Sequence, residues 1–284
     1  MSETGFRQRP IFGEGLGLPR SVSYGIALLH WSLLSLRPDR VLRLLLILSH
    51  QRSGSTLLLQ CLNTHPMVMG YGETLMTYRR ASDLYCLPTK VAVRLRRPFP
   101  GAKYFLDKLL YDELLADERL LQLPCVYTIF LLRDPDQALP SLINAPKLEG
   151  WVQRPEANRD YVDQANCERY YSGRLATLAR YAELVPRDRS LFLTYDDILH
   201  HTQSVFHALA KILGVENRFS EHYPVMRTTG VAGLGDVSPH IRGGQIKRDI
   251  KRPPVKVEPA LLNSARQSFE ASSRIIDTHC TRIK

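Results

Sequence analysis

The sequence has few cysteines, and they form no recognisable pattern. Of 284 residues only five are cysteine: Cys61, Cys86, Cys125, Cys167 and Cys280. Their odd number, their scattered spacing and the lack of a Cys-x-x-Cys pair argue against a disulfide framework and against a zinc site. We therefore expect a reducing, cytoplasmic compartment. Cys61 and Cys125 lie in apolar runs, where cysteine commonly packs as a small buried hydrophobic residue.

The N-terminal region lacks an apolar run of membrane-spanning length. Residues 21–36 carry no formal charge, but they number only 16 and include His30 and four serines. A spanning helix needs about 20 apolar residues, and no cleavage site typical of a secretory signal follows. A strand is predicted to begin near Leu44, which leaves no room for a stem behind a membrane anchor. We therefore expect a helix that is buried or lies on a membrane surface, with an anchor as the alternative.

Acidic residues are outnumbered by basic ones, 28 against 38, which gives a net charge of +10. This excess favours anionic partners such as nucleic acid, a membrane surface or a phosphorylated or sulfated ligand, although a merely basic surface is equally compatible with it. The hydrophobic content of 44% is ordinary for a globular protein. We expect residues 1–40 to form an extension with a helix, and residues 41–284 to form one domain.

Continuous apolar runs alternate with helical patterns along the chain. The runs occupy residues 41–49, 125–135 and 190–198, and they are typical of parallel strands covered on both faces. Helices are predicted from Ser55 to just before Pro66, from an N-cap at Thr202 to Gly214, and near the C-terminus. This alternation predicts an α/β fold in which helices flank a parallel sheet. Ligands of such sheets bind beyond the carboxyl ends of the strands.

Three stretches are less regular. Residues 79–103 are basic and contain three prolines, which indicates a loop with a short helix. Residues 102–123 begin like a strand and then show leucines at helical spacing. Residues 227–254 are rich in glycine and basic residues, which predicts a long loop of the kind that is usually functional or disordered.

One predicted strand–loop–helix segment, "SHQRSGSTLLL", has the composition of an anion site. The loop residues Arg52, Ser53, Gly54, Ser55 and Thr56, here called the cradle, combine a permanent charge with hydroxyl donors, a glycine and the start of a helix. Backbone N–H groups and the helix dipole there favour an anion. The loop lacks the lysine that precedes Ser/Thr in nucleoside-triphosphatase loops. The sequence also shows no obvious magnesium-binding aspartate at a strand end, so a kinase is disfavoured.

A second segment, "LLRDPDQALPSL", suits another phosphate. Arg133 ends a predicted strand, and Ser141 lies eight residues later on the predicted next helix. Asp134 or Asp136 can cap that helix, and Pro135 suits its first turn. Arg133 and Ser141 are therefore expected to bracket a phosphate, with a surface ion pair of Arg133 as the alternative.

These motifs carry a family resemblance. "HQRSGSTLLLQCLNTHP" resembles the 5′-phosphosulfate loop of sulfotransferases that use 3′-phosphoadenylyl sulfate, "RDPDQALPS" resembles their 3′-phosphate motif, and "LFLTYDDI" resembles their Tyr-Glu-Asp strand. The resemblance covers about residues 41–247. "RSGSTLLLQCLNTHPMVMGYGETL" looks closest to the branch of tyrosylprotein and small bacterial sulfotransferases. The resemblance implies a P-loop-like fold and transfer of a sulfuryl group to a hydroxyl or amine, without a metal.

The resemblance also implies how the sulfuryl donor would be held. The cradle would hold the 5′-phosphosulfate, and Arg133 and Ser141 would hold the 3′-phosphate. Tyr195 would pack near the adenine. Arg242 and Gly243 are candidates in a Gly-rich segment, residues 230–247, that would close over the donor. That segment departs from the Arg-Lys-Gly-Gly-Asp-Trp pattern of the cytosolic branch.

For catalysis, the resemblance implies that Glu73, in "GYGETL", takes the acceptor proton. Arg52 would neutralise the leaving phosphate, and Lys108 resembles a lysine that faces the sulfuryl group, with a solvated helix lysine as the alternative. Because no histidine follows a comparable strand motif, His50 and His65 are interpreted as structural.

The acceptor is left open by the sequence. Basic residues in 79–103 suit an acidic glycan or peptide, whereas Trp151, Tyr170 and Tyr171 suit an aromatic or lipid acceptor. Two other functions stay in view. One is a P-loop nucleotide or small-molecule kinase or NTPase. The other is a nucleic-acid-binding module, although the chain lacks a zinc pattern, a helix-turn-helix and a basic helix with interleaved aromatics, so no nucleic-acid partner is expected.

Overall fold

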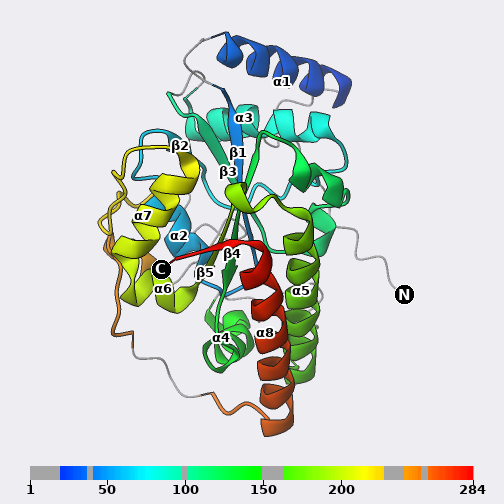
Figure 1. Ribbon diagram of the computed structural model, residues 1–284, viewed down its shortest axis with the longest axis vertical. Helices are drawn as coiled ribbons and strands as arrows, with labels where there is room; N and C mark the ends of the chain where they lie inside the picture. Colours follow the sequence, from blue (N-terminus) through cyan, green and yellow to red (C-terminus); the bar gives the residue numbers. More distant parts are fainter. Residues whose placement is uncertain are drawn as a thin grey trace.

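The computed structural model describes residues 20–36, 41–97, 101–148, 163–226, 240–250 and 255–283. Within them, six parallel strands form one sheet in the order β2-β3-β1-β4-β5-β6 (Figure 1). The strands are β1 (Arg43–Ser49), β2 (Val68–Met69), β3 (Tyr104–Leu109), β4 (Val126–Leu132), β5 (Ser190–Thr194) and β6 (Thr281–Arg282). The predicted α/β fold with a parallel sheet flanked by helices is confirmed.

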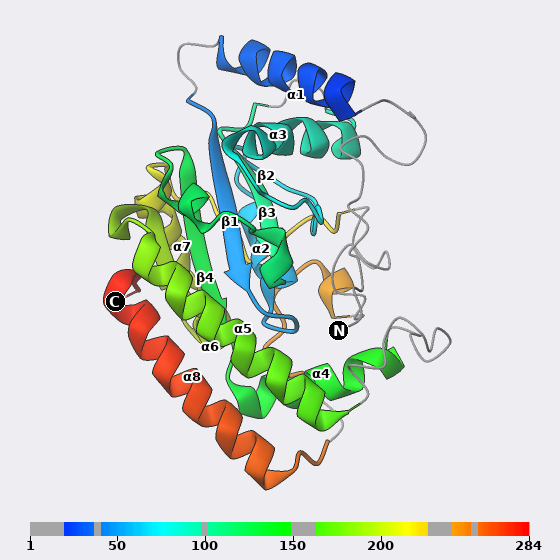
Figure 2. The same cartoon turned by 90° about the vertical axis from the view of Figure 1, so that its right-hand side faces the viewer.

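Helices cover both faces of the sheet (Figures 1 and 2). They are α1 (Arg20–Ser35), α2 (Ser55–Leu62), α3 (Ala81–Leu95), α4 (Pro135–Leu148), α5 (Gln164–Leu184), α6 (Tyr195–His200), α7 (Thr202–Leu213) and α8 (Pro259–His279). Residues of α2, α6 and α7 share one hydrophobic core with one face of the sheet. Residues of α1, α3, α4, α5 and α8 share the core on the other face. The site described below lies where these layers meet the ends of the strands.

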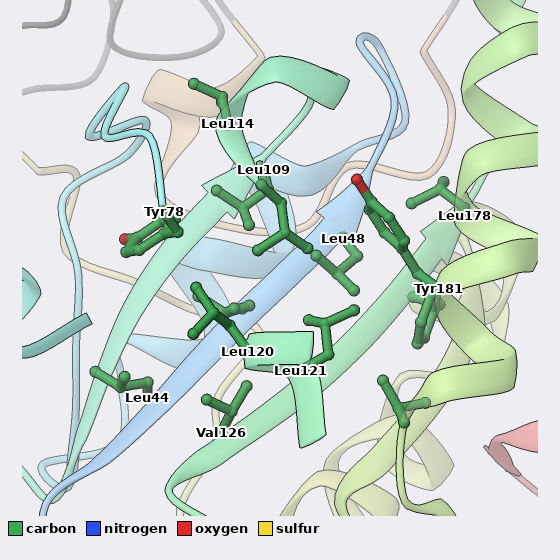
Figure 3. Packing of buried hydrophobic residues seen from close by; sticks show 14 of the residues in the cluster. Leu44, Leu48, Tyr78, Leu109, Leu114, Leu120, Leu121, Val126, Leu178 and Tyr181 are labelled. Atoms are coloured by element: carbon green, nitrogen blue, oxygen red, sulfur yellow. The ribbon is translucent and has the colours of Figure 1, made fainter. Parts of the chain in front are cut away.

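The central strand shows how the apolar runs build the two cores. From Leu44 to Leu48 every side chain of β1 is buried. Because successive side chains of a strand point to opposite faces, Leu44 and Leu48 pack in the core next to α5, where Figure 3 shows Leu48 near Leu109 and Leu121. Leu45 and Ile47 pack in the core next to α2 and α7. A run that is apolar on both faces is therefore the signature of a strand buried on both sides.

Two predicted element ends are wrong, and at the first of them a capping box explains the difference. The third run was expected to stay extended to Ile198, but β5 ends at Thr194. The Thr194 hydroxyl accepts a hydrogen bond from the Asp197 N–H, and the Asp197 carboxylate accepts one from the Thr194 N–H, which starts α6. Thr202 is the first residue of α7 rather than its N-cap, whereas Gly214 ends α7 in the left-handed conformation as predicted.

Residues 79–103 contain a longer helix than predicted. Helix α3 spans 15 residues and includes Pro88. The Asp83 carboxylate accepts hydrogen bonds from the N–H groups of Arg79 and Arg80 at the start of α3. Leu84, Leu87 and other apolar side chains of its inner face are fully buried, and this burial outweighs the hydrogen bond that the proline removes.

The opposite error occurs in residues 102–123. The strand at their start is confirmed as β3, but the leucines that follow do not form one α-helix. Instead they lie in two short 3-10 turns, η1 (Asp112–Leu114) and η2 (Glu118–Gln122). Leu114, Leu120 and Leu121 still enter the core (Figure 3), which explains the apolar spacing without a helix.

The predicted N-terminal helix is present as α1, which packs on α3. None of the helices in the described ranges is both long and apolar enough to cross a membrane. The division of the chain at residue 40 stays a prediction. Trp151 and most of the predicted loop 227–254 lie outside the described residues.

Candidate active site

The candidate site lies where three strands end at the same edge of the sheet. Strand β1 lies between β3 and β4 in the sheet. After β1 the chain forms β2 and β3 on one side of it and then crosses to form β4 on the other side. Such a reversal of direction leaves a crevice at the carboxyl ends of the strands, where α/β proteins bind ligands. The cradle follows β1 at this edge and leads directly into α2.

The cradle has the backbone of an anion-binding loop. Arg52 and Gly54 both have positive φ angles, 61° and 93°. At Gly54 a side chain is excluded on two grounds, since a Cβ there would also lie 2.3 Å from the Tyr195 ring. The N–H of Leu58 bonds to the C=O of Gly54. Because an α-helix leaves its first N–H groups without intrahelical partners, those of the cradle end are directed beyond the start of α2.

The Ser53 side chain makes hydrogen bonds within the protein. Its hydroxyl is fully buried and shares a hydrogen bond of 2.6 Å with the hydroxyl of Ser49, which also reaches the C=O of Leu131 at 2.7 Å. The Ser55 N–H donates to Ser53 Oγ at 3.3 Å. The Ser53 side chain therefore ties the cradle to the ends of β1 and β4, which leaves its backbone as the part that can meet a ligand.

Arg133 connects the cradle to β4 and to helix α4. Its Nη1 donates to the C=O of Arg52 at 2.8 Å, and its Nε and Nη2 donate to Gln137 Oε1 at 3.3 and 3.2 Å. Its Cζ lies 4.2 Å from the centroid of the Tyr195 ring, a cation–π contact. The Arg52 Nε donates to Ser141 Oγ at 3.0 Å. The two predicted anion sites therefore adjoin each other, with Arg52 reaching the serine expected to serve the second.

Lys108 and Glu73 converge on the helix side of the cradle. Lys108 lies within β3, not after it or on a helix, and its side chain is only 1% exposed. Its Nζ lies 3.0 Å from Thr56 Oγ1 and 3.3 Å from Glu73 Oε1. Glu73 comes from the loop after β2, and its side chain is 13% exposed. The loop that lacks a lysine in its own sequence thus receives an ammonium group from the neighbouring strand.

Asp107 is a buried acid that the sequence reasoning missed. It lies on the opposite face of β3 from Lys108, and it accepts hydrogen bonds from the Thr74 N–H (3.0 Å), the Thr74 hydroxyl, the Tyr78 hydroxyl (2.8 Å) and the Lys108 N–H (2.8 Å). Burial raises its pKa, and the hydrogen bonds from Thr74 and Tyr78 act against that rise. The pair Asp-Lys inside an apolar strand, "YFLDKLL", was the available signal.

Side chains of helix α5 bind backbone C=O groups at the carboxyl ends of β1, β3 and β4. Arg174 donates to the C=O of Ser49 at 2.9 Å and to the C=O of Leu109 at 2.6 Å. The Tyr171 hydroxyl donates to the C=O of Arg133 at 2.6 Å. The Tyr171 side chain, which the sequence left open as one of those that suit an aromatic or lipid acceptor, is fully buried in this role. Tyr170 accepts from the Gln51 N–H and donates to the C=O of Leu110, both at 2.9 Å.

The remaining residues that were predicted to contact the sulfuryl donor lie on the side of α6 and α7. The Tyr195 ring forms a wall of the cradle, since it packs on Gly54 and under Arg133. Arg242 is exposed in the 3-10 turn η6 (Ile241–Gly243). A Cβ on Gly243 would meet the Lys247 side chain, and the next residue's C=O accepts from the Tyr223 N–H. Their contact with a donor, like that of Tyr195 with adenine, stays a prediction.

The two histidines that were interpreted as structural, His50 and His65, have hydrogen-bond partners within the protein. His50 is fully buried beside the cradle, its Nδ1 lies 2.8 Å from the C=O of Gln51, and its Nε2 accepts from the Arg133 N–H at 3.1 Å. This arrangement requires a neutral ring with the proton on Nδ1. Burial lowers the pKa of His50 to about 4. His65 lies 3.0 Å from the C=O of Glu216 and accepts from the Met67 N–H.

Comparisons with known proteins support the fold assignment. No family model matches the sequence, and no curated protein matches it. Among solved structures, the sulfotransferase domain from the curacin biosynthetic pathway is similar with a TM-score of 0.54 and 17% identity, over 82% of this chain and 98% of that domain. The sulfotransferase domain of the Synechococcus PCC 7002 olefin synthase is similar with a TM-score of 0.50 and 18% identity, over 81% and 96%. The chain therefore has the fold of sulfotransferase domains.

Acidification should destabilise the protein through His50. Its pKa is about 4 in the folded chain and about 6.5 when unfolded, so the unfolded state binds the extra proton first as the pH falls below 6.5. Between pH 7 and pH 5 this lowers the free energy of unfolding by about 2 kcal/mol. Urea unfolding of the wild type and of His50→Gln, whose amide oxygen can accept from Arg133, measures the difference. Equal losses in both proteins would contradict the assignment.

Proposed function

We propose that the protein is a sulfotransferase that moves a sulfuryl group from 3′-phosphoadenylyl sulfate to a hydroxyl or amine acceptor, with Glu73 as the base. The observation that carries the proposal is the meeting of Lys108, Thr56 and Glu73 at the start of α2. The Glu73 carboxylate and the buried Lys108 ammonium group thus lie next to a loop whose backbone suits an anion. The likeness in fold to two sulfotransferase domains supports the same reaction class.

The chemistry of the donor set fits a nucleotide with anionic groups at two positions. The cradle amides, Arg52 and the Thr56 hydroxyl suit the 5′-phosphosulfate, because they combine a helix N-terminus with a permanent charge. Arg133 and Ser141 suit the 3′-phosphate, since they lie beside the cradle on the α4 side. The close contact between Gly54 and the Tyr195 ring leaves this loop no room for a side chain that would block the amides.

The transfer requires one bond to form as another breaks. The sulfuryl sulfur leaves the phosphate oxygen, which keeps the electron pair, and joins the acceptor oxygen or nitrogen in line. Arg52, Lys108 and the cradle amides stabilise the charge that grows on the leaving phosphate and on the sulfuryl oxygens. Glu73 takes the proton from the acceptor. No covalent enzyme intermediate is needed, because positioning and electrostatics suffice.

The position of Glu73 is held by its neighbour in sequence. Thr74 is bound to Asp107 through both its N–H and its hydroxyl, and Lys108 binds Glu73 directly. Consecutive residues of the loop are therefore fixed by consecutive residues of β3. A base fixed in this way lies next to the cradle without being fully buried, so that an acceptor can reach it.

Calorimetry with two nucleotides tests the proposed donor. Adenosine 3′,5′-bisphosphate, the product, should bind without added metal, because the cradle and Arg133 supply the positive charge. ATP with magnesium should bind much more weakly, since ATP has no 3′-phosphate for Arg133 and Ser141 to hold. Tight binding of ATP with magnesium and none of the bisphosphate would instead identify a P-loop kinase or NTPase.

Glu73→Gln should separate catalysis from binding. Without the base, turnover should fall by about 10²- to 10⁴-fold. The dissociation constant of adenosine 3′,5′-bisphosphate should stay within about twofold of the wild-type value. Turnover is measured as transfer of radiolabelled sulfate to the best acceptor from a panel of phenols, amines, glycans and peptides. The exposed Glu270→Gln on α8 is the matched control and should behave as the wild type. An unchanged rate in Glu73→Gln would remove Glu73 from the reaction.

Arg133→Ala and Ser141→Ala test the 3′-phosphate site. The loss of one charge-assisted hydrogen bond costs about 1.5–3 kcal/mol, so binding of adenosine 3′,5′-bisphosphate should weaken roughly 10- to 150-fold in Arg133→Ala. Binding of adenosine 5′-monophosphate should weaken far less. Because Arg133 also holds the C=O of Arg52, Ser141→Ala is the cleaner variant. An equal loss for both nucleotides in Ser141→Ala would assign these residues a structural role only.

A further inference from the structure

Helix α1 is held on α3 by one of its faces. The Tyr24 hydroxyl bonds to the Asp83 carboxylate, and His30 Nδ1 lies 2.9 Å from Thr89 Oγ1. The Trp31 ring packs on the Tyr85 ring with centroids 4.7 Å apart. Ala27 and Leu34 are buried in the same contact. The orientation of α1 about its own axis is therefore fixed by specific polar and aromatic contacts.

The outward face of α1 is apolar as well. Its side chains are between 41% and 75% exposed, and they belong to Val22, Ile26, Leu29, Leu33 and Leu36. The spacing alternates between four and three residues, which places them in one stripe along the helix. Leu28 is also exposed, but at 100° per residue it lies to one side of this stripe. A contiguous exposed apolar stripe marks a surface that binds another apolar surface. We call Val22, Ile26, Leu29, Leu33 and Leu36 the α1 stripe.

Basic residues are concentrated in the sequence segments around α1 and α3. The sequence segments 20–40 and 79–97 contain nine arginines and lysines against two aspartates, a net charge of +7 out of the +10 of the whole chain. Arg80, Arg94, Arg96 and Arg97 are exposed at the two ends of α3, which lies under α1. The Arg80 guanidinium also lies 5.3 Å from the Tyr24 ring, at the junction of the two helices.

We propose that the α1 stripe and these arginines dock the protein on an anionic membrane surface. An apolar face with basic flanks is the pattern of helices that lie in the plane of a membrane interface. Each basic side chain near anionic headgroups adds to the attraction. Helix α1 has 16 residues, about 24 Å at 1.5 Å per residue. It is therefore shorter than the hydrocarbon core of about 30 Å and lies along the surface.

A second copy of the chain suits this surface less well. Pairing two α1 helices would bring two clusters of arginines together, and like charges oppose that contact. The stripe also spans only about two heptads, which is short for a stable helix pair in water. The charge complementarity therefore favours lipid headgroups over a homodimer.

The docking surface lies at the opposite end of the molecule from the candidate active site. Both views show α1 at the end where β1 begins, whereas α4 and the cradle lie toward the end where β1 finishes (Figures 1 and 2). Docking would therefore leave the cradle open to the aqueous side. For this reason membrane binding should be independent of nucleotide binding, and the inference does not rest on the proposed function.

Sedimentation of the full chain with lipid vesicles tests the inference. We expect binding to vesicles of phosphatidylcholine mixed with phosphatidylserine, weaker binding to phosphatidylcholine alone, and a loss of binding as salt is added. Leu29→Ser with Leu33→Ser should lower the partition coefficient about tenfold or more. The matched control is Val225→Ser with Ile275→Ser, two similarly exposed apolar residues elsewhere, and it should bind as the wild type. Circular dichroism checks that each variant is folded.

A second pair of variants tests the charge alone. Arg94→Gln with Arg97→Gln leaves the stripe intact and should weaken binding to the anionic vesicles by about fivefold or more. The inference is wrong if the wild type does not bind anionic vesicles, or if the stripe variant binds as tightly as the wild type. It is also wrong if the wild type is a dimer in ultracentrifugation and the stripe variant a monomer while neither binds vesicles, since the stripe then serves a second copy.

Discussion

The hydrogen bond from the Arg133 guanidinium to the C=O of Arg52 is the contact on which the site depends. The cradle holds a non-glycine residue at positive φ at its start, a conformation that persists only when surrounding contacts impose it. Arg133 supplies that contact, while its own backbone is fixed by His50 on one side and by Tyr171 on the other. Strands β1 and β4 and helices α4 and α5 thus all act on the cradle through one arginine. An anion at this loop also offsets the mutual repulsion of two permanent cations.

The parts of this arrangement that are local in sequence could be predicted. The apolar runs of β1 and β4 reveal strands buried on both faces, and Gly54 at the start of a helical pattern reveals the loop between β1 and α2. Long-range contacts could not be predicted in the same way. Arg174 reaches the ends of β1 and β3 across more than sixty residues of chain, and the leucines after β3 have a helical spacing that the structure uses in 3-10 turns. Periodicity reports which side chains are buried, and it does not report the element that buries them.

The most informative of these long-range contacts involve two adjacent residues of β3. Side chains alternate across a strand, so Asp107 and Lys108 point to opposite faces of the sheet. They nevertheless bind two adjacent residues of one loop, Thr74 and Glu73. Strand β2 pairs with only the first two residues of β3. The carboxyl end of β3 therefore has no strand beside it on that side, and the loop after β2 can contact both of its faces. Gly70 permits the approach, since a Cβ there would lie 2.8 Å from the C=O of Leu106.

The same geometry explains why the net charge of the chain is a poor guide to its site. Among the residues that the structure describes, the cations at the cradle are Arg52, Lys108 and Arg133, and Lys108 is paired with Glu73. Most of the positive excess lies instead in the segments that form α1, α3 and their flanks. Helices α1 and α3 lie at the end of the sheet away from the cradle (Figure 2). Screening over a Debye length of about 8 Å therefore removes most of the effect of the charges on these helices on a ligand at the site. A basic chain and an anion-binding site are therefore two separate features of this molecule, and each needs its own physical explanation.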